Sequence, residues 1–131
     1  MRCGTVLHHS SLQFQDGTTA AKFLVVLNSP RPPANYLCCK TTSRQKNRPG
    51  SPGCHSRYNL FVVDPCSCFR SRTWIQFHEF YEVSVNDLLR LKFNGIISIV
   101  GDLDPVTSRS LVECVKSSDD VSPYYLSLLG S

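Results

Sequence analysis

Phe23-Leu24-Val25-Val26-Leu27 is a continuous run of apolar and branched residues. Runs of this kind form strands that are buried on both faces. Three prolines break the chain between Asn28 and Asn35, and Tyr36-Leu37-Cys38-Cys39-Lys40-Thr41-Thr42 then shows a second strand pattern. The short connection predicts that the two strands pair antiparallel.

Further strand patterns lie on either side of this pair, at residues 4–7, 59–63, 72–77 and 95–100. Residues 80–83 either extend the strand that ends at Phe77 or form a bent neighbour, and Ser84 can cap a helical turn over residues 84–89. The polar segments 8–19 and 43–57 are expected to be loops. One helix is expected over residues 103–117, because Asp104 can cap it and Pro105 suits its first position.

These elements predict one domain over residues 1–131, with strands and loops to about residue 101 and a tail over residues 118–131. Five or six short strands joined by tight turns and closed by one C-terminal helix indicate a mainly β fold. We expect a small half-open β-barrel.

The charge pattern is uneven. Between Gly17 and Val63 the chain has no acid but has seven cationic residues: Lys22, Arg31, Lys40, Arg44, Lys46, Arg48 and Arg57. A folded segment of this kind cannot neutralise itself, so it favours an anionic partner, most simply a nucleic acid. No apolar run is long enough to predict a membrane span, and no apolar signal segment follows Met1, so the default expectation is a cytoplasmic protein.

The seven cysteines are an odd number, and a reducing cytosol would keep most of them as thiols. Cys38, Cys39 and Cys114 lie within apolar patterns and are expected to be buried thiols. A second group, Cys54, His55, Cys66 and Cys68, could bind zinc, but its spacing is not the usual Cys-x2-Cys. We therefore expect a thiol-rich hairpin loop without a metal, and we expect no cofactor.

Four motifs in order along the chain carry a family resemblance. They are Lys22-Phe23-Leu24-Val25-Val26-Leu27-Asn28-Ser29-Pro30, Tyr36-Leu37-Cys38-Cys39-Lys40-Thr41-Thr42-Ser43-Arg44, Thr73-Trp74-Ile75-Gln76-Phe77, and Gly95-Ile96-Ile97-Ser98 with the helix after it. Together they resemble the MazF/PemK toxin family. The resemblance implies an SH3-like barrel, a homodimer, and an endoribonuclease that a protein antitoxin holds in check. It also implies cleavage of single-stranded RNA without metal, by attack of a 2′-hydroxyl on the neighbouring phosphate.

The resemblance also implies site residues. Lys22 occupies the position of a family arginine, and Thr42, with Thr41 as the near alternative, ends the next strand; both are expected at the scissile phosphate. Lysine lacks the bidentate fork of arginine. The remaining RNA contacts are expected from the basic loop and the fifth strand, namely Thr41, Arg44, Lys46, Arg48 and Gln76.

Other residues have less specific interpretations. His8 or His9 could transfer protons, and His78 and Glu79 are expected on the solvent face. Trp74 is expected in the core rather than stacked on a base, and Arg70 and Arg72 could join the basic surface. Two alternatives to a nuclease remain: a non-catalytic module that binds nucleic acid or protein through the same groove, and a protein that assembles through its C-terminal helix and the Tyr124-Tyr125 tail.

Overall fold

A computed structural model describes residues 1–31 and 33–129 of the chain. The strands are β1 (Thr5–Gln13), β2 (Thr19–Val26), β3 (Tyr36–Thr42), β4 (Gly53–His55), β5 (Leu60–Val63), β6 (Thr73–Val83) and β7 (Ile97–Asp102). The α-helices are α1 (Val85–Phe93), α2 (Pro105–Lys116) and α3 (Pro123–Leu129), and a 3-10 helix, η1, spans Ser56–Tyr58.

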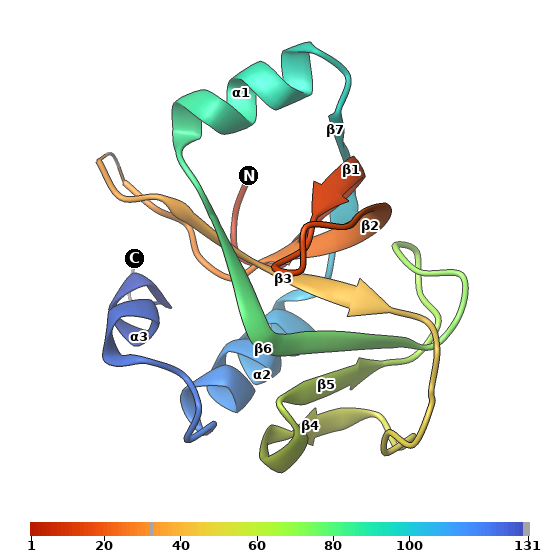
Figure 1. Cartoon of the computed structure of the whole chain (residues 1–131). Helices are drawn as coiled ribbons and strands as arrows, with labels where there is room; N and C mark the ends of the chain where they lie inside the picture. The colour runs from red at the N-terminus through yellow and green to blue at the C-terminus, as the bar shows by residue number, and fades with distance from the viewer. Residues whose placement is uncertain (32, 130–131) are drawn as a thin grey trace.

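All seven strands form one antiparallel sheet in the order β4-β5-β6-β3-β2-β1-β7 (Figure 1). Over the described residues the sheet does not close on itself, so β4 and β7 are its edges. The expectation of a mainly β fold is confirmed, and so is the antiparallel pairing of β2 with β3. The expectation of one helix is wrong, because the turn after Ser84 and the C-terminal tail both form helices.

Each face of the sheet carries a core. Helices α2 and α3 contribute Leu111, Val115 and Leu129 to the larger core, beside Val25 and Ile75 of the sheet. On the opposite face, α1 contributes Leu88 to a smaller core. In Figure 1, α1 accordingly lies on one side of the strands while α2 and α3 lie on the other.

The helix starts follow the local chemistry that the sequence predicts. The Asp104 carboxylate accepts the N–H of Thr107 at 2.8 Å, and proline follows it at the start of α2. The Ser84 hydroxyl accepts the N–H of Asp87 at 3.1 Å at the start of α1. Each cap satisfies one backbone donor that the first helical turn would otherwise leave free.

Two segments expected to be loops contain strands. Strand β1 continues through His8 and His9 to Gln13 because its partner β2 begins at Thr19, earlier than the apolar run suggests. Strand β4 occupies three residues of the expected 43–57 loop and pairs with β5. Residues 80–83 extend the fifth predicted strand, so β6 runs from Thr73 to Val83.

Strand β6 changes register within its length. Cys39 of β3 pairs with Phe80, whereas the next residue, Lys40, pairs with Gln76. Residues 77–79 therefore form a bulge. An odd number of inserted residues reverses which face each side chain occupies.

The prediction that Cys114 is a free thiol is wrong. Cys54 of β4 and Cys114 of α2 form a disulfide, which connects the edge of the sheet to the helix beneath it. Cys38 and Cys39 are buried thiols as expected, and burial raises the pKa of Cys38 to about 12. Within residues 1–31 and 33–129 no three metal-binding side chains gather.

The two edges of the sheet differ. Strand β4 has three residues and is connected to α2, whereas β7 has six and exposes Ile99 and Val100 by 44% and 40%. In the described part of the chain, every helix is too short or too polar to cross a bilayer.

Candidate nucleic-acid interface

Lys22 and Thr42 lie on neighbouring strands. The pairing of β2 with β3 runs as far as Leu24 with Lys40, and Lys22 and Thr42 each lie two residues beyond that pair on their own strands. Both residues line one cleft of about 680 Å³. The structure therefore brings together the two residues that the resemblance assigns to the scissile phosphate.

Positive charge collects around Lys22. Burial lowers the pKa of Lys22 most, and the nearby charges of Lys40, Arg44 and Arg48 lower it further. Among the described residues, Lys22, Arg44 and Arg48 have no ion pair, and only Lys40 is neutralised. Because these cations repel one another, an anion bound here would lower the electrostatic energy of the group.

The Thr42 hydroxyl is suited to donate a hydrogen bond. Its oxygen accepts the N–H of Arg44 at 3.2 Å, so its proton remains available to another acceptor. The Thr41 side chain is committed elsewhere. Its hydroxyl is buried and donates to the Phe23 carbonyl at 3.0 Å. Thr42 is therefore the better placed of the two threonines to meet a phosphate.

The other predicted RNA contacts divide into two groups. Arg44 donates its backbone N–H to the Thr42 hydroxyl and Arg48 donates to the Arg44 carbonyl, so both lie next to the cleft, and their charges lower the pKa of Lys22. Lys46 is exposed in the loop between β3 and β4 and does not belong to that group of charges. Gln76 is only 7% exposed, pairs with Lys40 and does not line the cleft, so its amide is not presented to a ligand there.

The sequence did not predict an ion pair that lies, largely buried, next to these cations. Lys40 Nζ lies 3.0 Å from the Glu79 carboxylate, which also accepts the N–H of Gln15 at 3.2 Å. Burial alone would raise the pKa of Glu79, but the hydrogen bond and charge of Lys40 outweigh it and the pKa is lowered. His78 is exposed as expected, whereas Glu79 is buried because it belongs to the bulge of β6.

Two histidines of β1 flank the cleft residues of β2. His9 pairs directly with Lys22, and its Nδ1 accepts the N–H of Ser11 at 3.1 Å. Burial first, and the charge of His8 second, lower the pKa of His9. In its neutral form, His9 therefore has Nε2–H as its available donor.

An exposed aromatic ring lies in the lining of the cleft. The Phe23 side chain is 39% exposed. Its ring packs edge-to-face against Phe69 at 6.0 Å and against His8 at 5.1 Å. Arg70, also in the lining, has no ion pair within the described residues. Together they combine an aromatic surface with a cation, a pairing that suits a nucleotide.

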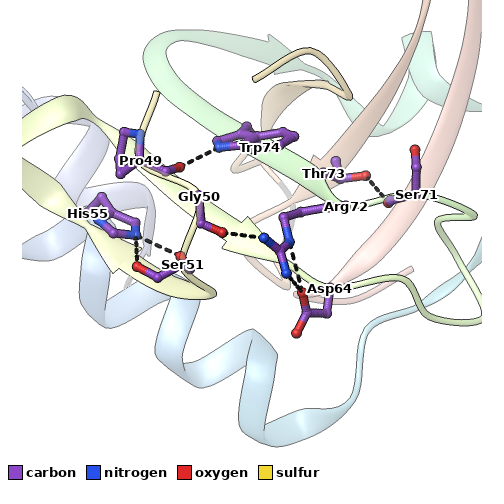
Figure 2. A network of polar contacts seen from close by, with 9 residues as sticks. All are labelled: Pro49, Gly50, Ser51, His55, Asp64, Ser71, Arg72, Thr73 and Trp74. Atoms are coloured by element: carbon purple, nitrogen blue, oxygen red, sulfur yellow. Dashed lines mark hydrogen bonds and ion pairs between the residues drawn. The ribbon is translucent and has the colours of Figure 1, made fainter. Parts of the chain in front are cut away.

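The loop that carries the arginines is attached to β6 and to the residue just before that strand (Figure 2). Trp74 donates its indole N–H to the Pro49 carbonyl at 2.7 Å, and Arg72 donates to the Gly50 carbonyl at 2.7 Å. The expectation that Trp74 is a core residue is confirmed, since it is 3% exposed. Arg72 does not join the free cations, because it pairs with Asp64.

Comparisons with known proteins add no assignment. No protein-family model matches the chain, and no curated protein or solved structure is significantly similar to it. The MazF/PemK resemblance therefore depends on the motifs alone, and any function has to be argued from the arrangement of side chains described above.

Proposed function

We propose that this protein is an endoribonuclease of the MazF/PemK kind, built on an SH3-like half-open barrel, that cuts single-stranded RNA without a metal. One observation carries the proposal. Lys22 and Thr42 line one open cleft, and the loop with Arg44 and Arg48 is bonded to the Thr42 hydroxyl. None of these three cations has an acid partner among the described residues. Uncompensated cations beside a hydroxyl donor suit a phosphodiester.

The proposed reaction needs no group beyond the RNA and the protein. The 2′-oxygen attacks the adjacent phosphorus and loses its proton, and the bond from phosphorus to the 5′-oxygen breaks as that oxygen gains a proton. The products are a 2′,3′-cyclic phosphate and a 5′-hydroxyl. Lys22 would stabilise the negative charge of the phosphorane, and its lowered pKa would ease proton exchange. Thr42 would donate a hydrogen bond to a phosphate oxygen.

The surroundings of the cleft would hold the rest of the strand. Arg44 and Arg48 would bind the phosphates next to the scissile one. The exposed ring of Phe23 would stack on a base, a contact that tolerates any base because each has a π-face.

The remaining parts of the proposal concern partners and location. A protein antitoxin with an acidic segment would compete with RNA for the same cations. The open edge strand β7 supports a homodimer, since an unpaired strand is a template for another. A cytoplasmic location fits an RNA substrate, whereas the Cys54–Cys114 disulfide is more typical of oxidising compartments.

The test is to incubate single-stranded RNA of mixed sequence with the protein and identify the new ends. We expect 2′,3′-cyclic phosphate and 5′-hydroxyl ends. Lys22→Ala should slow cutting about 100-fold or more, the usual effect of removing one group that stabilises transition-state charge. Lys92→Ala, which removes an exposed lysine of α1, is the control and should cut normally. Equal rates for the two variants would contradict the role of Lys22.

A non-catalytic binding module is the second candidate. Lysine replaces the family arginine, and the Nδ1 lone pair of His9, the imidazole opposite Lys22, is already occupied. Both observations favour binding over cleavage. Salt-sensitive binding of RNA without any new ends would decide for this candidate.

A further inference from the structure

The loop of residues 43–52, called the basic loop here, is compact at its tip. Arg48 donates its backbone N–H to the Gln45 carbonyl at 2.9 Å and a guanidinium N–H to the Arg44 carbonyl at 2.8 Å. Lys46 and Asn47 have positive φ values of 26° and 57°, which turn the chain back on itself. Residues 44–48 therefore hold their own shape, but these bonds do not fix where the tip lies relative to the sheet.

Arg72 makes that connection. Its Nη1 donates to the Gly50 carbonyl at 2.7 Å, while Nε and Nη2 lie 3.0 Å and 2.9 Å from one carboxylate oxygen of Asp64. Asp64 directly follows β5, and Arg72 directly precedes β6. One guanidinium thus joins the basic loop to two strands of the sheet, with its donors directed at protein acceptors (Figure 2).

Trp74 makes a parallel attachment one residue earlier in the loop. Its buried indole donates to the Pro49 carbonyl at 2.7 Å. Because Trp74 pairs with Thr42 across β3 and β6, the attachment point lies on the strand next to the proposed phosphate site. The adjacent residues Pro49 and Gly50 are therefore held by β6 and by the residue just before it.

We propose that Arg72 is a positioning residue for RNA binding: it holds the basic loop so that Arg44 and Arg48 lie beside Lys22. The inference depends on the proposed function and deepens it. Arg72 makes no contact with RNA itself. It acts through the Gly50 carbonyl, with Asp64 fixing the orientation of its guanidinium.

A double-mutant cycle tests the proposal. The dissociation constant of a single-stranded RNA oligonucleotide is measured over a range of salt concentrations for Arg72→Ala, Arg48→Ala and the double variant. Arg72→Ala should weaken binding and lower the salt slope by about 0.7 for each phosphate contact that the loop loses. Adding Arg48→Ala should then cost little more, because that contact is already lost. Additive effects would mean that Arg72 binds RNA directly, and unchanged binding would mean that it does not position the loop; either result overturns the proposal.

Asp64 supplies a second test, in which charge alone and the positioning role predict opposite changes in RNA affinity. Removing an acid near a cationic site strengthens the binding of a polyanion if charge alone matters. Asp64→Asn should instead weaken it, because Arg72 loses the partner that orients it. Asp87→Asn removes an exposed acid of α1 that also pairs with an arginine, and it should leave RNA affinity unchanged. Tighter binding by Asp64→Asn would contradict the positioning role.

A readout without RNA separates this inference from the proposed function. Trp74 is the one tryptophan of the chain, so its indole proton gives a single identifiable NMR signal. Arg72→Ala should speed exchange of that proton with solvent, because the loop that covers it is released. If the unmodified protein binds no RNA, the proposed function and this role both fail. The exchange rate still shows whether Arg72 holds the loop, and an unchanged rate would exclude even that.

Discussion

Reduction of the Cys54–Cys114 disulfide should lower the free energy of unfolding by about 4 kcal/mol. The two cysteines are 60 residues apart in the chain, and closing a loop of that length restricts the unfolded ensemble far more than the folded one. The chain-entropy relation gives an entropy difference of about 14 cal/mol/K, or about 4 kcal/mol at 25 °C. For a chain of this size the corresponding fall in melting temperature is about 15 °C.

The assay is urea unfolding followed by Trp74 fluorescence, with and without dithiothreitol. Cys54 is exposed and can be reached by the reductant, which becomes oxidised as the two thiols form. The double variant Cys54→Ala with Cys114→Ala should match the reduced protein and show no further response to dithiothreitol. Alanine is preferred at position 114 because that side chain is buried and a hydroxyl there would lack water.

A matched control tests the specificity of the effect. Cys66 is exposed and free, so Cys66→Ala should leave the stability and its response to reductant unchanged. A loss of less than about 1 kcal/mol on reduction would refute the reasoning, because the entropic term alone exceeds that value. A response to reductant that persists in the double variant would assign the effect to another cysteine.

Three further predictions concern single side chains. Glu79→Gln should cost about 3 kcal/mol at neutral pH, because the half-buried Lys40 loses the carboxylate that neutralises it; since the folded pKa of Glu79 lies below its ordinary 4.5, the difference from the unmodified protein should vanish as pH falls through that lower value, as urea titrations over a pH series would show. Phe23→Ala should weaken RNA binding about 10-fold without changing the salt slope, because stacking is lost while phosphate contacts stay; a changed slope would assign Phe23 to the charge network instead. Ser84→Ala should cost about 1 kcal/mol through loss of the cap on the Asp87 N–H, and an unchanged urea midpoint would contradict that account of α1.

Features that depend on neighbours in sequence could be predicted. The apolar runs that become β2 and β3, and the caps at Ser84 and Asp104, follow from the conformational preferences of a few adjacent residues. The basic composition of the loop after β3 is equally visible. The order of the motifs predicts that Lys22 and Thr42 lie at one site, and both residues line the same cleft.

Features that depend on distant partners could not be predicted. Strand β4 is too short to show a periodic pattern, and it forms because β5 lies beside it. Cys54 and Cys114 carry no local sign that they pair across 60 residues. Arg72 looked like one more cation of an RNA surface, because the sequence does not show that Asp64 and the Gly50 carbonyl would occupy it.

The bulge in β6 explains why the sequence left residues 80–83 open as an extension or a bent neighbour, and why Glu79 is buried. A period of two applied from Trp74 onwards assigns the wrong face to every residue after the bulge, since three extra residues reverse the alternation. Nothing in residues 77–79 marks the reversal, because phenylalanine, histidine and glutamate are all compatible with an uninterrupted strand. Glu79 was expected on the solvent face because polar side chains near the end of a strand are usually exposed. Within the bulge it is instead buried beside Lys40.

The unequal edges of the sheet limit how copies of this chain can associate. A molecule whose sheet has two open edges can pair with a neighbour at each edge and grow into a filament. Here β4 is short and connected to α2, so β7 is the edge available for a further strand. In the proposed homodimer, joining through β7 would pair the open edge of both copies, so association would stop at two.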